Sequence, residues 1–107
     1  MEKLNPAGLH ATPGYHHVTV VGAGRLAFLA GQCPLDANGT LVGPGDVLEQ
    51  ADQVAANALA VLDAVGAKPS DVVRSVIYVV SGDQQILGAV WRRLNESPLA
   101  PDRKSVV

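Results

Sequence analysis

The clearest periodic pattern in this chain lies between residues 47 and 65. Apolar residues recur there every three or four positions, which is the spacing of one face of an α-helix. Asp46 stands at the N-cap position with Glu49 three residues later, which approximates a capping box. Gly66 stands where a helix of this kind closes. The pattern therefore predicts an amphipathic helix over 47–65.

A second helix is predicted from about Gln84 to Asn95. Its apolar face would consist of Ile86, Leu87, Val90, Trp91 and Leu94. Arg92, Arg93 and Glu96 would face water. Both predicted helices thus present one apolar face to a core.

Runs of β-branched and other apolar residues predict the strands. Residues 15–21 and 26–30 are two such runs separated by the glycine turn at 22–24, so we expect an antiparallel hairpin. Residues 72–80 form a third run, rich in valine, isoleucine and tyrosine. Residues 104–107 begin a fourth. Several of these runs are apolar on both faces, which is typical of buried strands.

The predicted order is β-β-α-β-α-β, preceded by an extended arm at residues 1–14 and interrupted by turns at 36–39 and 69–71. Two helices on one face of a mixed sheet make a two-layer α+β fold. No helix is left to cover the other face. We therefore expect residues 1–107 to form one domain that associates with further copies of itself.

Composition narrows the functional classes. Of 107 residues, 48% are hydrophobic and 17% are charged, which suits one compact domain. The net charge of −2 gives no excess of cations to neutralise a phosphate backbone, so we expect no nucleic-acid partner. The apolar stretch 26–35 is too short to cross a bilayer, and the first residues lack the apolar centre of a signal peptide. We expect a soluble cytoplasmic protein without a membrane partner.

One short motif resembles a nucleotide-binding site, but its surroundings do not fit one. Residues 20–27 match the Gly-x-Gly-x-x-Ala form of the dinucleotide fingerprint. That site requires a helix to open at the second glycine, whereas Gly31 and Pro34 would end such a helix after about two turns. We interpret the motif as a hairpin turn.

Few side chains are obvious candidates for chemistry. The histidines His10, His16 and His17 lack the helical i, i+4 spacing often used to bind metals, so no metal site is predicted. Cys33 is the one cysteine, which excludes an internal disulfide, and we interpret it as a packing residue. Arg103 leads into the last predicted strand, where a guanidinium can hold a carboxylate with two parallel hydrogen bonds.

The chain resembles the reactive-intermediate deaminase family (RidA, also called YjgF/YER057c/UK114) over residues 15–107. Residues 30–34, Ala-Gly-Gln-Cys-Pro, are similar to the family's Ser-Gly-Gln-Ile-Pro. A helix with Gln50, Asn57 and Leu59 follows, and residues 70–79 resemble the family's third strand. Residues 101–105, Pro-Asp-Arg-Lys-Ser, are similar to its Pro-Ala-Arg-Ser segment.

The resemblance implies a chorismate-mutase-like fold and a homotrimer with clefts between subunits. Family members hydrolyse reactive enamines and imines of amino acids to 2-keto acids and ammonia, and they use no cofactor. By this resemblance Arg103 would hold the substrate carboxylate. Gly31, Gln32 and Cys33 would line the same intersubunit cleft. A deaminase would also need a base in place of the family's catalytic glutamate, and His17, which is not part of the family's pattern, is the candidate catalytic residue.

The chain also departs from the pattern of the deaminating members. His17 stands where they have a tyrosine, Ala30 where they have a serine, and Gly88 where they have an asparagine. The family's final strand, with its glutamate, has no counterpart before Val107. Three functions therefore stay open: an imine or enamine deaminase, a non-catalytic trimer that binds small carboxylates, and an endoribonuclease.

Overall fold

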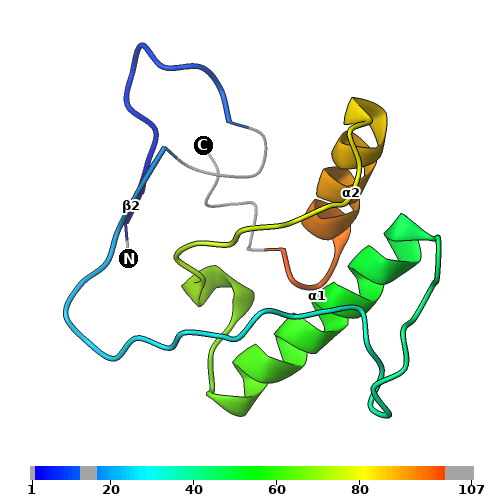
Figure 1. The fold of residues 1–107 in the computed structure, drawn as a ribbon. Helices are drawn as coiled ribbons and strands as arrows, with labels where there is room; N and C mark the ends of the chain where they lie inside the picture. Colours follow the sequence, from blue (N-terminus) through cyan, green and yellow to red (C-terminus); the bar gives the residue numbers. More distant parts are fainter. Residues whose placement is uncertain (1, 13–16, 101–107) are drawn as a thin grey trace.

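The computed structural model describes residues 2–12 and 17–100. Its elements in chain order are strands β1 (Glu2–Leu4) and β2 (Val18–Val20), helix α1 (Val47–Ala64), a short 3₁₀ helix η1 (Pro69–Asp71) and helix α2 (Gln84–Glu96). Figure 1 shows the two helices against each other, with the β1–β2 ribbon on the opposite side of the molecule. The described residues thus form an α+β arrangement with two helices and a small antiparallel sheet.

Helix α1 confirms the predicted boundaries, and local hydrogen bonds explain both ends. The Asp46 carboxylate accepts a hydrogen bond of 3.1 Å from the backbone N–H of Glu49. At the other end Gly66 has a φ of +71°, a left-handed conformation that glycine adopts at little cost. The N–H groups of Gly66 and Ala67 donate to the carbonyls of Asp63 and Leu62, which is a Schellman motif.

Helix α2 also lies where the apolar pattern predicted it. Asp83 caps its first turn by accepting a 2.8 Å hydrogen bond from the N–H of Gln85. Val90 of α2 is buried, and α2 contacts α1. Among the described residues the buried core consists of Ala51, Ala55 and Leu62 from α1 together with Val90. The core is therefore the seam between the two helices, and the alanines of α1 let α2 approach closely.

The predicted strands differ from the structure. Residues 26–30 and 72–80 carry no strand ladder, so the hairpin with 15–21 is absent. Instead β2 pairs with β1, with Lys3 opposite Thr19, so part of the predicted arm is a strand. A strand exists only where a second backbone segment satisfies its N–H and C=O groups, and the sequence pattern does not specify that segment. Residues 104–107 lie outside the described residues.

The turns predicted at 36–39 and 69–71 are present, the second as the 3₁₀ helix η1, whereas the glycines at 22–24 do not form the predicted hairpin turn. The Asp36 carboxylate accepts hydrogen bonds from the N–H groups of Asn38 and Thr40, and Gly39 takes a φ of +77°. Leu35 and Leu41 form an isolated antiparallel bridge across this turn. In the segment that connects β2 to α1, the part nearer the helix, residues 35–41, is thus held by its own hydrogen bonds.

The fold is open for its length. Its radius of gyration is 14.9 Å, whereas a compact domain of this size would have about 13 Å. Large apolar side chains are exposed along the segments predicted to be strands, among them Phe28, Val76, Tyr78 and Val80. The two helices thus pack against each other, whereas no other part of the described chain buries the apolar side chains of residues 26–30 and 72–80 listed above.

Candidate functional site

The predicted binding residues Gly31, Gln32 and Cys33 lie in a loop, residues 31–35, that passes beside α1. Asn57 of α1 donates from Nδ2 to the carbonyl oxygen of Cys33 at 3.1 Å and to that of Leu35 at 2.9 Å. The Cys33 carbonyl also accepts a hydrogen bond of 2.7 Å from the N–H of Leu35. This i to i+2 bond defines a γ-turn centred on Pro34. The loop is thus tied to the helix at its carbonyl groups.

A second side-chain amide supports this tie. Gln53 lies one helical turn before Asn57 and donates from Nε2 to the Asn57 Oδ1 at 2.9 Å. Both side chains are half-buried. Because the carbonyl end of the Asn57 amide is engaged by Gln53, its NH₂ end faces the loop. Gln53, Asn57 and the 31–35 loop are therefore connected by consecutive hydrogen bonds.

Another amide holds the next loop in a similar way. Gln50 donates from Nε2 to the carbonyl oxygen of Gly43 at 2.9 Å. Gly43 has a φ of +62°, and a Cβ there would lie 2.9 Å from the Cβ of Glu49. This position accordingly requires glycine. The segment 31–43 is thus fixed to α1 at two points, Asn57 and Gln50, which are about two helical turns apart.

The 31–33 stretch keeps its amide groups available. Within the described part of the chain, the backbone N–H groups of Gly31, Gln32 and Cys33 donate no hydrogen bond. The Gln32 side chain donates to the carbonyl of Ala30 at 3.1 Å, and Cys33 is exposed. A run of backbone N–H groups can accept a carboxylate without a metal or a cofactor. The loop thus offers N–H donors at residues 31–33, while the carbonyls of Cys33, Pro34 and Leu35 accept hydrogen bonds.

The structure places His17 elsewhere. Its backbone N–H donates to the Asn5 Oδ1 at 3.0 Å, and its ring Nε2 lies 2.9 Å from the carbonyl oxygen of His10. The rings of His10 and His17 meet edge to face, with centroids 4.7 Å apart. These contacts link His17 to the N-terminal ribbon and not to the 31–35 loop. Arg103, the predicted carboxylate ligand, lies outside the described residues.

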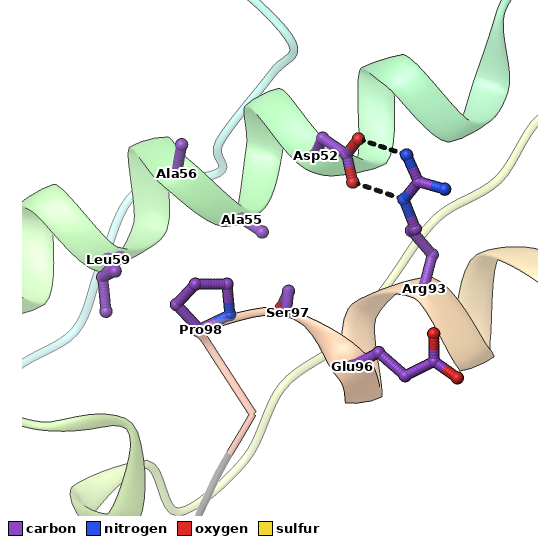
Figure 2. A pocket seen from close by; sticks show the side chains of 8 residues that line it. All are labelled: Asp52, Ala55, Ala56, Leu59, Arg93, Glu96, Ser97 and Pro98. Carbon is purple, nitrogen blue, oxygen red and sulfur yellow. Dashed lines mark hydrogen bonds and ion pairs between the residues drawn. The ribbon is translucent and has the colours of Figure 1, made fainter.

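A separate groove of about 450 Å³ runs between α1 and the end of α2 (Figure 2). Its lining residues are Asp52, Ala55, Ala56, Leu59, Arg93, Glu96, Ser97 and Pro98. At its rim the Arg93 guanidinium donates from Nε and Nη2 to the two oxygens of Asp52, at 2.8 and 2.7 Å. This bidentate bond holds the pKa of Asp52 below its usual value. The pair joins the two helices, because Asp52 lies on α1 and Arg93 on α2.

Two further findings concern function. No group of three or more His, Cys, Asp or Glu side chains that could hold a metal ion occurs within residues 2–12 and 17–100. No described helix is long and apolar enough to cross a membrane.

Sequence reasoning missed the role of the α1 amides. In the sequence pattern Asn57 is only a mark of the family resemblance, and Gln53 does not stand out from the other polar residues of the helix. Their spacing of four residues was the available signal, because residues at i and i+4 lie on one helical face. The loop that they hold is 22 to 24 residues away in sequence, so nothing local identifies it.

Several known proteins are similar to this chain. DfrA of Myxococcus xanthus is 40% identical over 80 residues, which are 74% of this chain and 61% of DfrA. The RutC family protein PH0854 of Pyrococcus horikoshii is 36% identical over 59 residues, which are 55% of this chain and 47% of that protein. The chain thus spans between about half and three fifths of the length of these curated relatives.

A solved structure and a family profile cover nearly the whole chain. The crystal structure of YyfB from Yersinia pestis, described as a protein of unknown function of the conserved Rid protein family, is 32% identical with a TM-score of 0.68. The match covers 94% of this chain and 80% of YyfB. The family profile described as Endoribonuclease L-PSP matches residues 7–107. The chain therefore belongs to the Endoribonuclease L-PSP family, which is the RidA/YjgF family indicated by its sequence motifs.

Proposed function

We propose that this protein hydrolyses small reactive 2-imino or 2-enamino acids to 2-keto acids and ammonia. The observation that carries the proposal is the 31–35 loop, in which the helix holds the carbonyls of Cys33 and Leu35 and the N–H groups of residues 31–33 are unoccupied within the described chain. A small carboxylate is a ligand that such amides suit. Family membership supports the same substrate class.

Each residue has a proposed role in this reaction. The Arg103 guanidinium and the amides of Gly31 and Gln32 hold the substrate carboxylate. A water oxygen adds to C2 of the protonated imine while a base takes one of the water's protons. The base passes that proton to the nitrogen and then takes the proton of the new C2 hydroxyl group as the C–N bond breaks, so that ammonia leaves and C2 becomes a ketone. A protonated imine is already electrophilic, so orientation and proton transfer supply the rate.

We propose His17 as that base, in a cleft between copies of a homotrimer. In the assembled protein, residues 26–30 and 72–80 would pair as strands and give the β-β-α-β-α-β order. Exposed apolar side chains support this assembly, since Phe28, Tyr78 and Val80 are each more than 90% exposed in the single chain. Apolar surface of this extent is typical of an interaction site.

A second function is a trimer that binds small carboxylates without turning them over. The contacts of His17 favour it, because the ring Nε2 lies 2.9 Å from the His10 carbonyl rather than beside the 31–35 loop. The replacements Ala30 and Gly88 point the same way. The endoribonuclease activity in the family's description is disfavoured by the net charge of −2 and the aromatic content of 4%.

The test is hydrolysis of 2-iminobutanoate generated in solution, followed as release of the keto acid. We expect the protein to accelerate it and Arg103→Ala to lower the acceleration about 100-fold or more, since the carboxylate would lose its ligand. Arg92→Ala is the matched control, because Arg92 is exposed on α2. Binding of 2-oxobutanoate without acceleration would establish the second function instead. If the protein neither accelerates the hydrolysis nor binds 2-oxobutanoate, both proposed functions are wrong.

A further inference from the structure

We propose that Asn57 and Gln53 are positioning residues that set the geometry of the carboxylate site at residues 31–33. This inference rests on the proposed function, since it assigns what holds that site in place. Asn57 contacts the loop, Gln53 contacts Asn57, and neither side chain is assigned a contact with the substrate. Its physical claim, however, is about where the loop amides lie, which can be measured whether or not the protein is a deaminase.

The first argument is the bridging geometry of Asn57. One NH₂ group donates to two carbonyls of the same turn, those of Cys33 and Leu35, at 3.1 and 2.9 Å. Pro34 lies between them and has a φ restricted to about −65°, close to the −75° of an inverse γ-turn. With both flanking carbonyls held and the central φ restricted, the peptide planes next to Cys33 have little freedom to turn.

The second argument is the orientation of the Asn57 amide itself. A side-chain amide can rotate by 180° and present either oxygen or NH₂ to its surroundings. Gln53 donates to Oδ1 at 2.9 Å and so keeps NH₂ toward the loop. A reversed amide would place its oxygen against two carbonyl oxygens, which is repulsive. Gln53 therefore acts on the loop through Asn57.

The third argument is the rigidity of the support. Helix α1 is capped at both ends, and Ala51, Ala55 and Leu62 bury its apolar face. A binding geometry is best kept when the supporting residues lie on a fixed element. The loop segment that follows is held separately, by Gln50 at Gly43, so the Asn57 contacts can be removed without releasing it.

The expected consequence is specific to the amides. Without Asn57 the γ-turn can open and the N–H groups of residues 31–33 change direction, while α1 and its seam with α2 stay in place. A displacement of about 1 Å at a binding site can cost about 100-fold in rate. We expect Asn57→Ala to lower kcat/KM for 2-iminobutanoate about 10- to 100-fold, and Gln53→Met to lower it less in the same direction.

The experiment uses the full chain with four changes: Asn57→Ala, Asn57→Asp, Gln53→Met and the control Gln50→Ala. Gln50 makes a comparable hydrogen bond from the same helix but to a different loop. The readouts are kcat/KM, calorimetric affinity for 2-oxobutanoate, and the backbone amide NMR resonances of residues 31–33. Affinity is measured between pH 7 and pH 4, and circular dichroism at each pH gives the folded fraction of every variant.

Asn57→Asp supplies a readout that lost stability alone would not produce. An ionised carboxylate has no proton to donate and repels the two carbonyls, whereas the protonated acid can donate to one of them. The affinity of this variant, relative to the unchanged protein at the same pH and corrected for folded fraction, should therefore rise as the pH is lowered toward 4. Asn57→Ala should show no such rise.

The outcomes separate this inference from the proposed function. Displaced amide resonances in both Asn57 variants, with those of Gln50→Ala unchanged, are the expected result. Resonances that stay in place in the folded Asn57 variants would overturn the inference even if the protein is an active deaminase. If the unchanged protein neither turns over nor binds its ligand, the proposed function fails, and the resonances alone decide whether Asn57 positions the loop.

Discussion

The helical layer and the strand segments of this protein contrast sharply. Helices α1 and α2 have caps, a buried seam and a bidentate ion pair between them. Residues 26–30 and 72–80 are at least as apolar, yet they have no ladder, and Val80 is fully exposed. Apolar content therefore does not explain the difference between them. A helix satisfies its backbone within the segment, whereas a strand needs a partner from elsewhere.

The 31–35 loop belongs structurally to the helical layer, although it is next in sequence to one of the apolar strand segments. It follows directly after residues 26–30, but its hydrogen bonds go to Asn57 on α1. The proposed ligand site thus lies where the well-packed part of the molecule meets the part that we propose other copies cover. Four experiments test this division, beginning with the largest expected effect.

A charge placed in the exposed apolar segment should prevent assembly. Val76→Asp would put a carboxylate into a proposed subunit contact, where an unpaired charge costs several kcal/mol. Light scattering after size exclusion should give the unchanged protein about three times the chain mass of 11.1 kDa, and the variant about the chain mass. Ala60→Asp, on an exposed position of α1, should leave assembly intact. Equal masses for all three proteins would contradict the proposed contact.

Truncating a buried side chain between the two helices should lower the free energy of unfolding more than the other single changes considered below. Leu62 is 6% exposed, so Leu62→Ala leaves a cavity and should cost about 2–5 kcal/mol. Urea unfolding followed by circular dichroism measures this loss. Val65→Ala, at the C-cap of the same helix, is the control, because Val65 is 57% exposed and its truncation should cost about 0.5 kcal/mol or less. Similar costs for the two changes would show that the seam is not the core.

Loss of a helix cap should have an intermediate effect. Asp46→Ala leaves the N–H of Glu49 without its acceptor and should lower the free energy of unfolding by about 1 kcal/mol. Asp63→Ala is matched to it in charge, but Asp63 lies in the last turn, where a negative charge opposes the helix dipole. That variant should be neutral or slightly more stable. If both changes cost the same, net charge and not capping would account for the result.

The smallest expected effect is the pH dependence of the Arg93–Asp52 pair. The hydrogen bonds from Arg93 lower the pKa of Asp52, so the pair stabilises the fold above the usual aspartate pKa of about 3.9. This contribution is lost as the pH falls through the lowered pKa of the folded state. Both side chains are nearly half exposed, so the contribution is small and screened by salt.

Thermal unfolding of the unchanged protein and of Asp52→Asn, from pH 7 to pH 3, tests this pair. The variant should melt at a slightly lower temperature at pH 7, and the gap should close toward pH 3 and in 1 M salt. A gap that widens toward low pH would reverse the assigned sign.

Structural features that depend on neighbouring residues could be predicted from the order of the amino acids alone. Both helices begin and end where their apolar periods and caps predicted, as with Asp46 and Gly66 at the ends of α1. The Asp36–Gly39 turn follows for the same reason, since an aspartate side chain binds the N–H groups of the residues just after it. Ordered motifs along the chain were also sufficient to identify the family.

Contacts between segments that are distant in sequence became known only from the folded chain. The sequence pattern predicts that residues 18–20 are extended, but β1 as their partner follows only from the folded chain. The same holds for Asn57, whose amide meets carbonyls 22 to 24 residues away. Hydrogen-bond donors and acceptors of the backbone are alike at every residue, so their pairing is fixed only by which segments the packed helices and turns bring within about 3 Å of each other.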